Sequence, residues 1–229
     1  MNVVRRTGLP LPHPRGKRLH ARMLAVPVAS LLVLGASITV AGGAAESRRD
    51  VEAKLHYCTS CHGVSGRGFR GYYPIPRLAG QQPEYLKNQL EAFSEKRRTN
   101  NIMFNVSHTL SGGMQSALAT DFQTFNPKPL GGAPKDLVPE GKKIFEEGIA
   151  AANIPPCAGC HGEDAKGNGQ FPRLAGQLDD YTVSKLTNWN KERGQVPDTP
   201  DPSTIMEPIA HGLTPAQIKA VAAYVSYLE

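Results

Sequence analysis

Cysteine is scarce in this chain of 229 residues: the sequence contains four, and all four lie in two short motifs of the form Cys-x-x-Cys-His. No cysteine is left over for a site outside these motifs. Alternation of apolar and polar residues is also missing, so no convincing strand is predicted. These absences favour a helical protein whose chemistry is concentrated at the two motifs.

Acidic residues are absent from the first 45 positions, which hold six of the 26 basic residues. The remainder carries 20 basic and 20 acidic residues, and this near-neutral body does not support nucleic-acid binding despite the net charge of +6. Residues 23–41 are largely apolar and lead into small residues ending at Ala45, which is the layout of a secretory signal. The alternative is a membrane association through residues 23–41 as an uncleaved anchor. Both interpretations predict that the folded part lies in the periplasm.

The body of the chain is a tandem repeat. A Cys-x-x-Cys-His-Gly motif ends at Gly63 and again at Gly162, and an identical Pro-Arg-Leu-Ala-Gly-Gln block follows at 76–81 and at 172–177. The stretch between the two copies is rich in Pro and Gly, which indicates a linker. The sequence therefore predicts a signal peptide or anchor over 1–45, a first domain over 46–125, a linker over 126–139 and a second domain over 140–229.

Helical signals occur in both copies. Thr214 is a good N-cap, Pro215 suits the first helical position, and apolar residues then follow at helical spacing. Pro83 opens a similar segment in the first copy. The last helix of the first domain is expected to be weaker, because it contains Gly112-Gly113 and Asp121. These patterns predict an all-α fold.

The Cys-x-x-Cys-His motif is typical of covalent haem attachment. Two thiols separated by two residues can each form a thioether to one vinyl group of a porphyrin, and the next histidine then lies beneath the iron. A redox dithiol, half of a zinc site or a disulfide also fits one such motif. The repetition of the histidine, behind an export segment, favours two covalently bound haem c groups. The predicted ligands are Cys58, Cys61 and His62 for one haem and Cys157, Cys160 and His161 for the other.

A sixth iron ligand is expected from methionine. Beyond residue 45 the sequence contains three methionines, and Met103 and Met206 occupy matching places, each seven residues before a Leu-Ser or Leu-Thr pair. We therefore predict that Met103 binds the iron of the first haem and Met206 that of the second. His108 and His211, five residues after each methionine, are the rival ligands.

Taken together, these repeated motifs resemble the dihaem "c-four" cytochromes over roughly residues 50–229. The resemblance implies two tandem class I cytochrome c-like domains related by pseudo-twofold symmetry. It also implies that Pro76 and Pro172 offer a backbone carbonyl to the ring N–H of His62 and His161. Further residues are expected near the haem propionates, namely Arg77, Arg173, Tyr85 and Tyr181.

The resemblance implies periplasmic electron transfer. The expected donor is a quinol–cytochrome c reductase or a dehydrogenase, and the expected acceptor is a terminal oxidase. A haem-containing subunit of a membrane dehydrogenase or oxidase complex is one alternative, and a dihaem peroxidase or thiosulfate-oxidising cytochrome is another. The enzymes of the thiosulfate type often use a cysteine ligand, and this chain has no spare cysteine. We therefore expect an electron-transfer protein rather than an enzyme.

Overall fold

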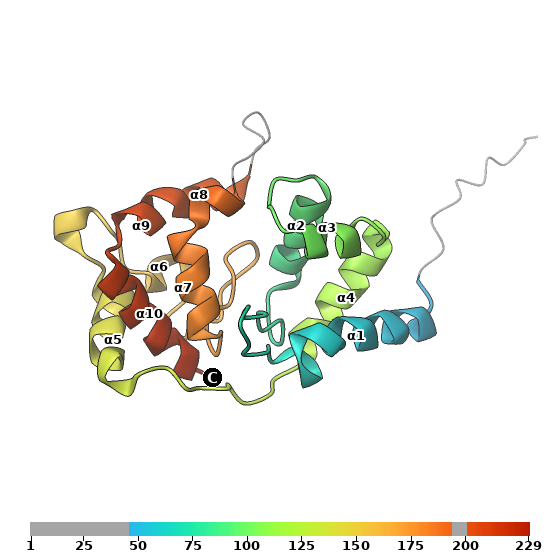
Figure 1. Ribbon diagram of the computed structural model, residues 1–229, viewed down its shortest axis with the longest axis horizontal. Coiled ribbons are helices and arrows are strands. Elements are labelled where there is room, and N and C mark those ends of the chain that lie inside the picture. The colour runs from blue at the N-terminus through green and yellow to red at the C-terminus, as the bar shows by residue number, and fades with distance from the viewer. Residues whose placement is uncertain (1–45, 194–200) are drawn as a thin grey trace, which may run out of the picture. The chain divides into compact units, whose positions relative to one another are not determined.

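The computed structural model describes residues 46–193 and 201–229, so the expected signal or anchor over 1–45 lies outside the described residues. The first repeat begins with the helix α1, which runs directly into the first motif. Its elements are α1 (Arg48–His62), η1 (Val64–Gly66), α2 (Pro83–Ser94), α3 (Asn101–Ser107) and α4 (Gly112–Thr124). Figure 1 traces these elements in order along the chain.

The second repeat has more and shorter helices before its motif. Its elements are η2 (Lys135–Leu137), α5 (Val138–Glu147), η3 (Ala150–Ala152), α6 (Ala158–His161), α7 (Asp179–Thr187), α8 (Trp189–Glu192), η4 (Pro202–Met206), α9 (Glu207–Gly212) and α10 (Pro215–Tyr227). Within the described ranges the only β-type pairing consists of isolated bridges. The predicted all-α fold is confirmed. No helix in those ranges is long and apolar enough to cross a membrane.

Both C-terminal helices of the repeats start at a side-chain cap. The Thr214 hydroxyl accepts from the Gln217 amide, and the Gln217 side chain accepts in turn from the Thr214 amide, so α10 begins with a full capping box. Ser111 accepts from the amide of Met114 at the start of α4. This cap lets α4 form over 13 residues, as α10 does, so the Gly112-Gly113 pair does not shorten the helix.

The second domain is built on a close crossing of α5 and α10. A Cβ atom on Gly141 would lie 1.9 Å from the carbonyl oxygen of Ala220, so only glycine allows the two backbones to meet there. Phe145 is fully buried, and its ring centroid lies 5.5 Å from that of Tyr224. Around this crossing lies the largest apolar core of the described chain.

The apolar interior of the first domain consists of two small clusters. Val51 of α1 packs with Met114 and Leu118 of α4, and a second small cluster forms around Leu86 and Phe122. These clusters contain fewer side chains than the core around α5 and α10. The first domain therefore depends more on groups other than its own apolar side chains to fill its interior.

Two buried glutamines join the repeats. The Arg77 amide donates to Oε1 of Gln177 over 2.9 Å, and Nε2 of Gln177 donates back to the Arg77 carbonyl over 3.1 Å. The Arg173 amide and carbonyl pair with Gln81 in the same way, over 2.6 and 3.0 Å. The reciprocity of these four bonds agrees with the pseudo-twofold relation of the two domains.

We predict that Gly141→Ala destabilises the protein. The new methyl group would collide with the backbone of Ala220, which cannot rotate away as a side chain could, so the free energy of unfolding should fall by about 1–3 kcal/mol or more. Denaturant unfolding of the haem-loaded protein measures this. Gly112→Ala is the matched control, because a Cβ atom there meets nothing within 4 Å and the change should be neutral or slightly stabilising. Equal effects of the two changes would contradict the close crossing.

Candidate haem sites

The first attachment motif occupies the last turn of α1. Cys58 is half-buried, Cys61 is exposed, and His62 is buried with 8 % of its surface accessible. Gly63 ends the helix with φ 79°, and a Cβ atom on it would lie 2.3 Å from the carbonyl oxygen of Gly68. The glycine after the histidine is therefore required for the chain to turn back against its own helix.

The second motif has the same geometry. Cys157 is half-buried, Cys160 is exposed and His161 is buried, and Gly162 follows with φ 80°. No disulfide joins the four cysteines, so all four sulfurs are available for thioether bonds.

Each motif histidine is fixed through its ring. Nδ1 of His62 lies 2.9 Å from the carbonyl oxygen of Pro76, and Nδ1 of His161 lies 2.8 Å from that of Pro172. A carbonyl can only accept, so Nδ1 carries the proton in both rings. Burial lowers the pKa of both imidazoles, which favours the neutral form. The Nε2 lone pair is therefore free to bind a metal.

The two predicted methionine ligands lie on short helices. Met103 is half-buried in α3, where Asn100 caps the helix by accepting from the Met103 amide over 2.9 Å. Met206 is half-buried at the end of η4. The rival residues His108 and His211 are both exposed, and His108 stacks on Phe104 at 5.4 Å.

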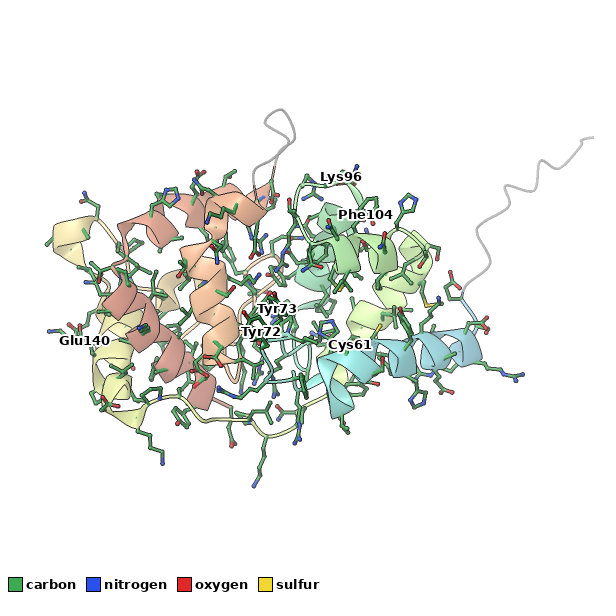
Figure 2. All side chains as sticks on the ribbon, viewed as in Figure 1. Cys61, Tyr72, Tyr73, Lys96, Phe104 and Glu140 are labelled. Atoms are coloured by element: carbon green, nitrogen blue, oxygen red, sulfur yellow. The ribbon has the colours of Figure 1, made fainter. Side chains whose placement is uncertain are left out.

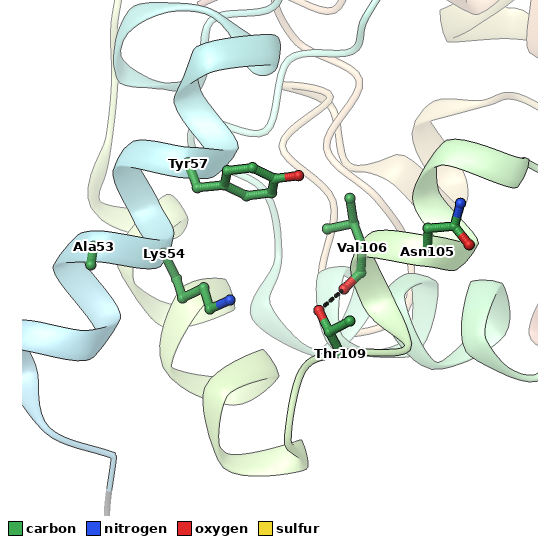
Figure 3. A pocket seen from close by; sticks show the side chains of 6 residues that line it. All are labelled: Ala53, Lys54, Tyr57, Asn105, Val106 and Thr109. Atoms are coloured by element: carbon green, nitrogen blue, oxygen red, sulfur yellow. Dashed lines mark hydrogen bonds between the residues drawn. The ribbon is translucent and has the colours of Figure 1, made fainter.

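A cleft separates α1 from the segment that carries Met103. It has a volume of about 390 Å³, within the range of small-molecule sites. Tyr57 and Lys54 line it from α1, and Val106 and Thr109 line it from α3 and the turn after it (Figure 3). The Thr109 hydroxyl donates to the Val106 carbonyl over 2.9 Å and closes that turn. The residues that line this cleft belong to the helices that carry the attachment motif and Met103, but they include neither the motif residues nor Met103 itself.

Two arginines lie buried beside the joint between the domains. Arg77 donates from Nε to the Ala79 carbonyl and from Nη1 to the Pro127 carbonyl, and Arg173 donates from Nε to the Ala175 carbonyl. Nη2 of each is buried and has no hydrogen-bond partner. Burial, and then the charge of Arg173, lowers the pKa of Arg77 to about 10. Arg77 and Arg173 are therefore buried cations, and each has one N–H donor group without a hydrogen-bond partner.

Comparison with known proteins decides the family. The Cytochrome c family model matches this chain twice, over residues 53–124 and 138–229. The chain belongs to the cytochrome c family. Cytochrome c-552 of Acidithiobacillus ferridurans is 36% identical over 87% of this chain and 87% of its own. The thiosulfate dehydrogenase electron acceptor of Thiomonas intermedia is 34% identical over 74% of this chain and 77% of its own.

The comparison with solved structures agrees. The cytochrome c4 structure from Acidithiobacillus ferrooxidans superposes with a TM-score of 0.65 at 38% identity and covers 75% of this chain and 98% of that one. The expected resemblance to the two-domain "c-four" cytochromes is thereby confirmed, as are two covalently bound haem c groups and a role in electron transfer.

The described residues fit this cofactor. A haem carries two carboxylates, and the unmet Nη2 donors of Arg77 and Arg173 are what such groups require when they are buried. A buried cation without a counter-charge is costly, so an anion beside each guanidinium would remove that cost. The neutral rings of His62 and His161 supply the nitrogen that the iron requires.

Sequence reasoning missed another pair of buried arginines. Arg98 stacks over Phe93 and Arg193 over Trp189, both at 4.6 Å, and the two arginines pair in an isolated bridge. The Arg98 guanidinium donates to the Tyr181 hydroxyl over 2.7 Å. Arg193 makes a side-chain hydrogen bond with Tyr85. Each tyrosine thus meets an arginine of the other domain, and whether it also reaches a propionate stays a prediction.

We predict that Arg77→Leu lowers the reduction potential of one haem. Removal of a buried cation favours the ferric state, and a unit charge at about 10 Å acts with roughly 1.7 kcal/mol at an effective dielectric constant of 20. That is about a 17-fold change in the ferric-to-ferrous ratio at a fixed potential, and an optical redox titration measures it. Arg67→Leu is the control, because Arg67 is exposed. An unchanged potential in Arg77→Leu would remove this arginine from the haem environment.

Proposed function

We propose that this cytochrome is a periplasmic carrier of single electrons, which it takes from a quinol–cytochrome c reductase or a dehydrogenase and passes to a terminal oxidase. The observation that carries the proposal is the buried joint between the two motif-bearing domains. Its hydrogen bonds join the Arg77 amide to Gln177 and the Arg173 amide to Gln81, and each arginine directly follows a proline that fixes a motif histidine. A rigid pair of one-electron sites suits exchange of electrons between two larger partners.

The relative from Thiomonas intermedia supports a dehydrogenase as the donor. Its name describes an electron acceptor of thiosulfate dehydrogenase. That protein and this one share 34% identity over 74% of this chain. A carrier that receives electrons from such an enzyme needs no substrate site of its own, which agrees with the absence of any cysteine outside the two motifs.

The proposed iron ligands are His62 with Met103 and His161 with Met206. Asn100 holds the start of α3 through the Met103 amide, and the Asp201 carboxylate similarly accepts from the Ser203 amide at the start of η4. Such caps restrict the short helices that carry the two methionines. Two closed, six-coordinate irons would leave no position for peroxide, in contrast to a dihaem peroxidase.

The first domain offers a surface on which a redox partner could dock. Cys61 is exposed, and the loop that follows the motif presents Tyr72 and Tyr73 with 92% and 78% of their surfaces accessible and their rings 4.8 Å apart (Figure 2). Val64, just after the motif, is 77% exposed. The corresponding position in the second domain is Glu163. These exposed apolar side chains, with the exposed Arg67 between them in the sequence, form the surface that we propose a redox partner contacts.

We predict that Met103→Leu abolishes the methionine-to-iron charge-transfer band of one haem and opens that iron to exogenous imidazole. The reason is that leucine fills a similar volume without a donor sulfur. Ferric absorption spectra and imidazole titration measure both effects, and Met206→Leu should act on the other haem. Met114→Leu is the control, since Met114 lies in the core with Val51. If His108→Ala removes the sixth ligand instead, the assignment to Met103 is wrong, and extensive high-spin iron in the unmodified protein would contradict a pure carrier.

We predict that Tyr72→Ser combined with Tyr73→Ser slows electron transfer to a purified terminal oxidase by about tenfold, because lost apolar contact of about 1.4 kcal/mol weakens docking. Stopped-flow oxidation of the ferrous protein measures the rate. Reaction with a small inorganic oxidant should not change. Glu163→Ser in the matching loop of the second domain is the control. A rate that depends on Glu163 and not on the tyrosines would assign docking to the second domain.

A further inference from the structure

A single peptide group links each motif histidine to the opposite domain. The carbonyl oxygen of the peptide between Pro76 and Arg77 accepts from Nδ1 of His62 over 2.9 Å. The N–H of the same peptide donates to Oε1 of Gln177, in the second domain, over 2.9 Å. His62, one peptide and Gln177 therefore form a continuous chain of hydrogen bonds across the joint.

The other half of the joint repeats this arrangement. The Pro172 carbonyl accepts from Nδ1 of His161 over 2.8 Å, and the Arg173 amide donates to Oε1 of Gln81 over 2.6 Å. Both glutamines are buried, with 5% and 8% of their surfaces accessible. Each glutamine also donates from Nε2 to the carbonyl of the same arginine, Gln81 to Arg173 and Gln177 to Arg77, which fixes the orientation of its side-chain amide. Each Oε1 also accepts from the amide of the next residue, Gln82 over 2.9 Å and Leu178 over 3.0 Å, so neither side chain can turn away without losing three hydrogen bonds.

The two ends of a peptide group influence each other. An acceptor on the N–H draws the amide toward its polar resonance form, which places more negative charge on the carbonyl oxygen, and chained hydrogen bonds strengthen one another by about 10–30%. A stronger carbonyl acceptor pulls the Nδ1 proton further from the imidazole and raises the basicity of Nε2. A more basic ligand stabilises ferric iron. Burial makes the effect larger, because the local dielectric constant is low.

We propose that each glutamine tunes the haem of the other domain: Gln177 acts through the Pro76–Arg77 peptide on His62, and Gln81 acts through the Pro172–Arg173 peptide on His161. They are positioning residues, since neither touches the iron. The inference rests on the electron-carrier function and deepens it, because docking of the domains then sets both potentials. Each potential depends on a residue that lies outside its own domain.

The test replaces each glutamine by methionine, which keeps an unbranched side chain of similar length and removes the acceptor. Gln177→Met should raise the potential of the first-domain haem, so that its ferrous-to-ferric ratio at a fixed potential rises about threefold. Gln81→Met should do the same to the second-domain haem. Optical redox titration gives both potentials. A Cys58→Ala background identifies the first-domain haem, because an unreacted vinyl group stays conjugated to the porphyrin and shifts its absorption band.

Gln82→Met is the matched control. Gln82 also crosses the joint, donating to the carbonyls of Lys166 and Gly167 over 2.9 and 3.2 Å, but its side chain bonds neither Pro–Arg peptide. It should leave both potentials unchanged. In the Gln177→Met protein, the NMR signal of the His62 Nδ1 proton should move in the direction of a weaker hydrogen bond while that of His161 stays, a response that general loosening would not produce.

Several outcomes would overturn the proposal. One is a change in the reduction potential of the haem in the same domain as the changed glutamine. The others are equal changes in both reduction potentials, no change in either, or a change in Gln82→Met as large as that in Gln177→Met. Failure of the carrier function is a separate result. It would appear in the unmodified protein as high-spin iron or as no electron exchange with partner proteins, while the crossed shifts of potential could still be present.

Discussion

The hydrogen bond from each motif histidine to a proline carbonyl is the constraint on which the rest of the structure depends. It fixes the tautomer of His62 and of His161 and so decides which ring nitrogen can meet an iron. To make it, the chain must reverse tightly after the histidine, which requires glycine at 63 and 162. The peptide that supplies the carbonyl then has its N–H pointing elsewhere, and a glutamine of the opposite domain satisfies that donor.

The joint is symmetric although the two domains are not. The second domain has a close helix crossing at Gly141 and one extended apolar core, whereas the first has two small clusters around a helix that runs directly into its motif. Symmetry is kept at the joint, at the two motifs and in the capped helices α4 and α10, and it is lost in the helices that precede the motifs. This pattern follows if the joint is constrained by the two cofactor sites, while the outer helices have only to cover each domain.

Sequence reasoning predicted what is local or repeated. The all-α fold followed from helical spacing and from the cap at Thr214, and the haem attachment followed from the motifs. The roles of Gln81 and Gln177 could not be predicted, because their partners lie in the other domain, far along the chain. Arg98 and Arg193 were missed for another reason. The first repeat has one additional residue near Lys96, which has φ 60°, so the two arginines do not align when the repeats are matched on their earlier motifs. The prediction that α4 is weak took account of Gly112 and Gly113 but not of the cap that Ser111 provides.

The body of the chain beyond residue 45 carries equal numbers of basic and acidic residues, yet the joint between the domains buries four arginines. Arg77, Arg173, Arg98 and Arg193 are all buried, with 3–7% of their surfaces accessible. Their hydrogen-bond partners are carbonyl and amide oxygens and phenols, and the nearest carboxylates that act on them are Glu192 on Arg98 and Asp164 on Arg173. Burial of several cations without counter-charges is costly. If propionates contact Arg77 and Arg173, as we propose, the same groups that complete the redox sites would also offset the repulsion between these two cations.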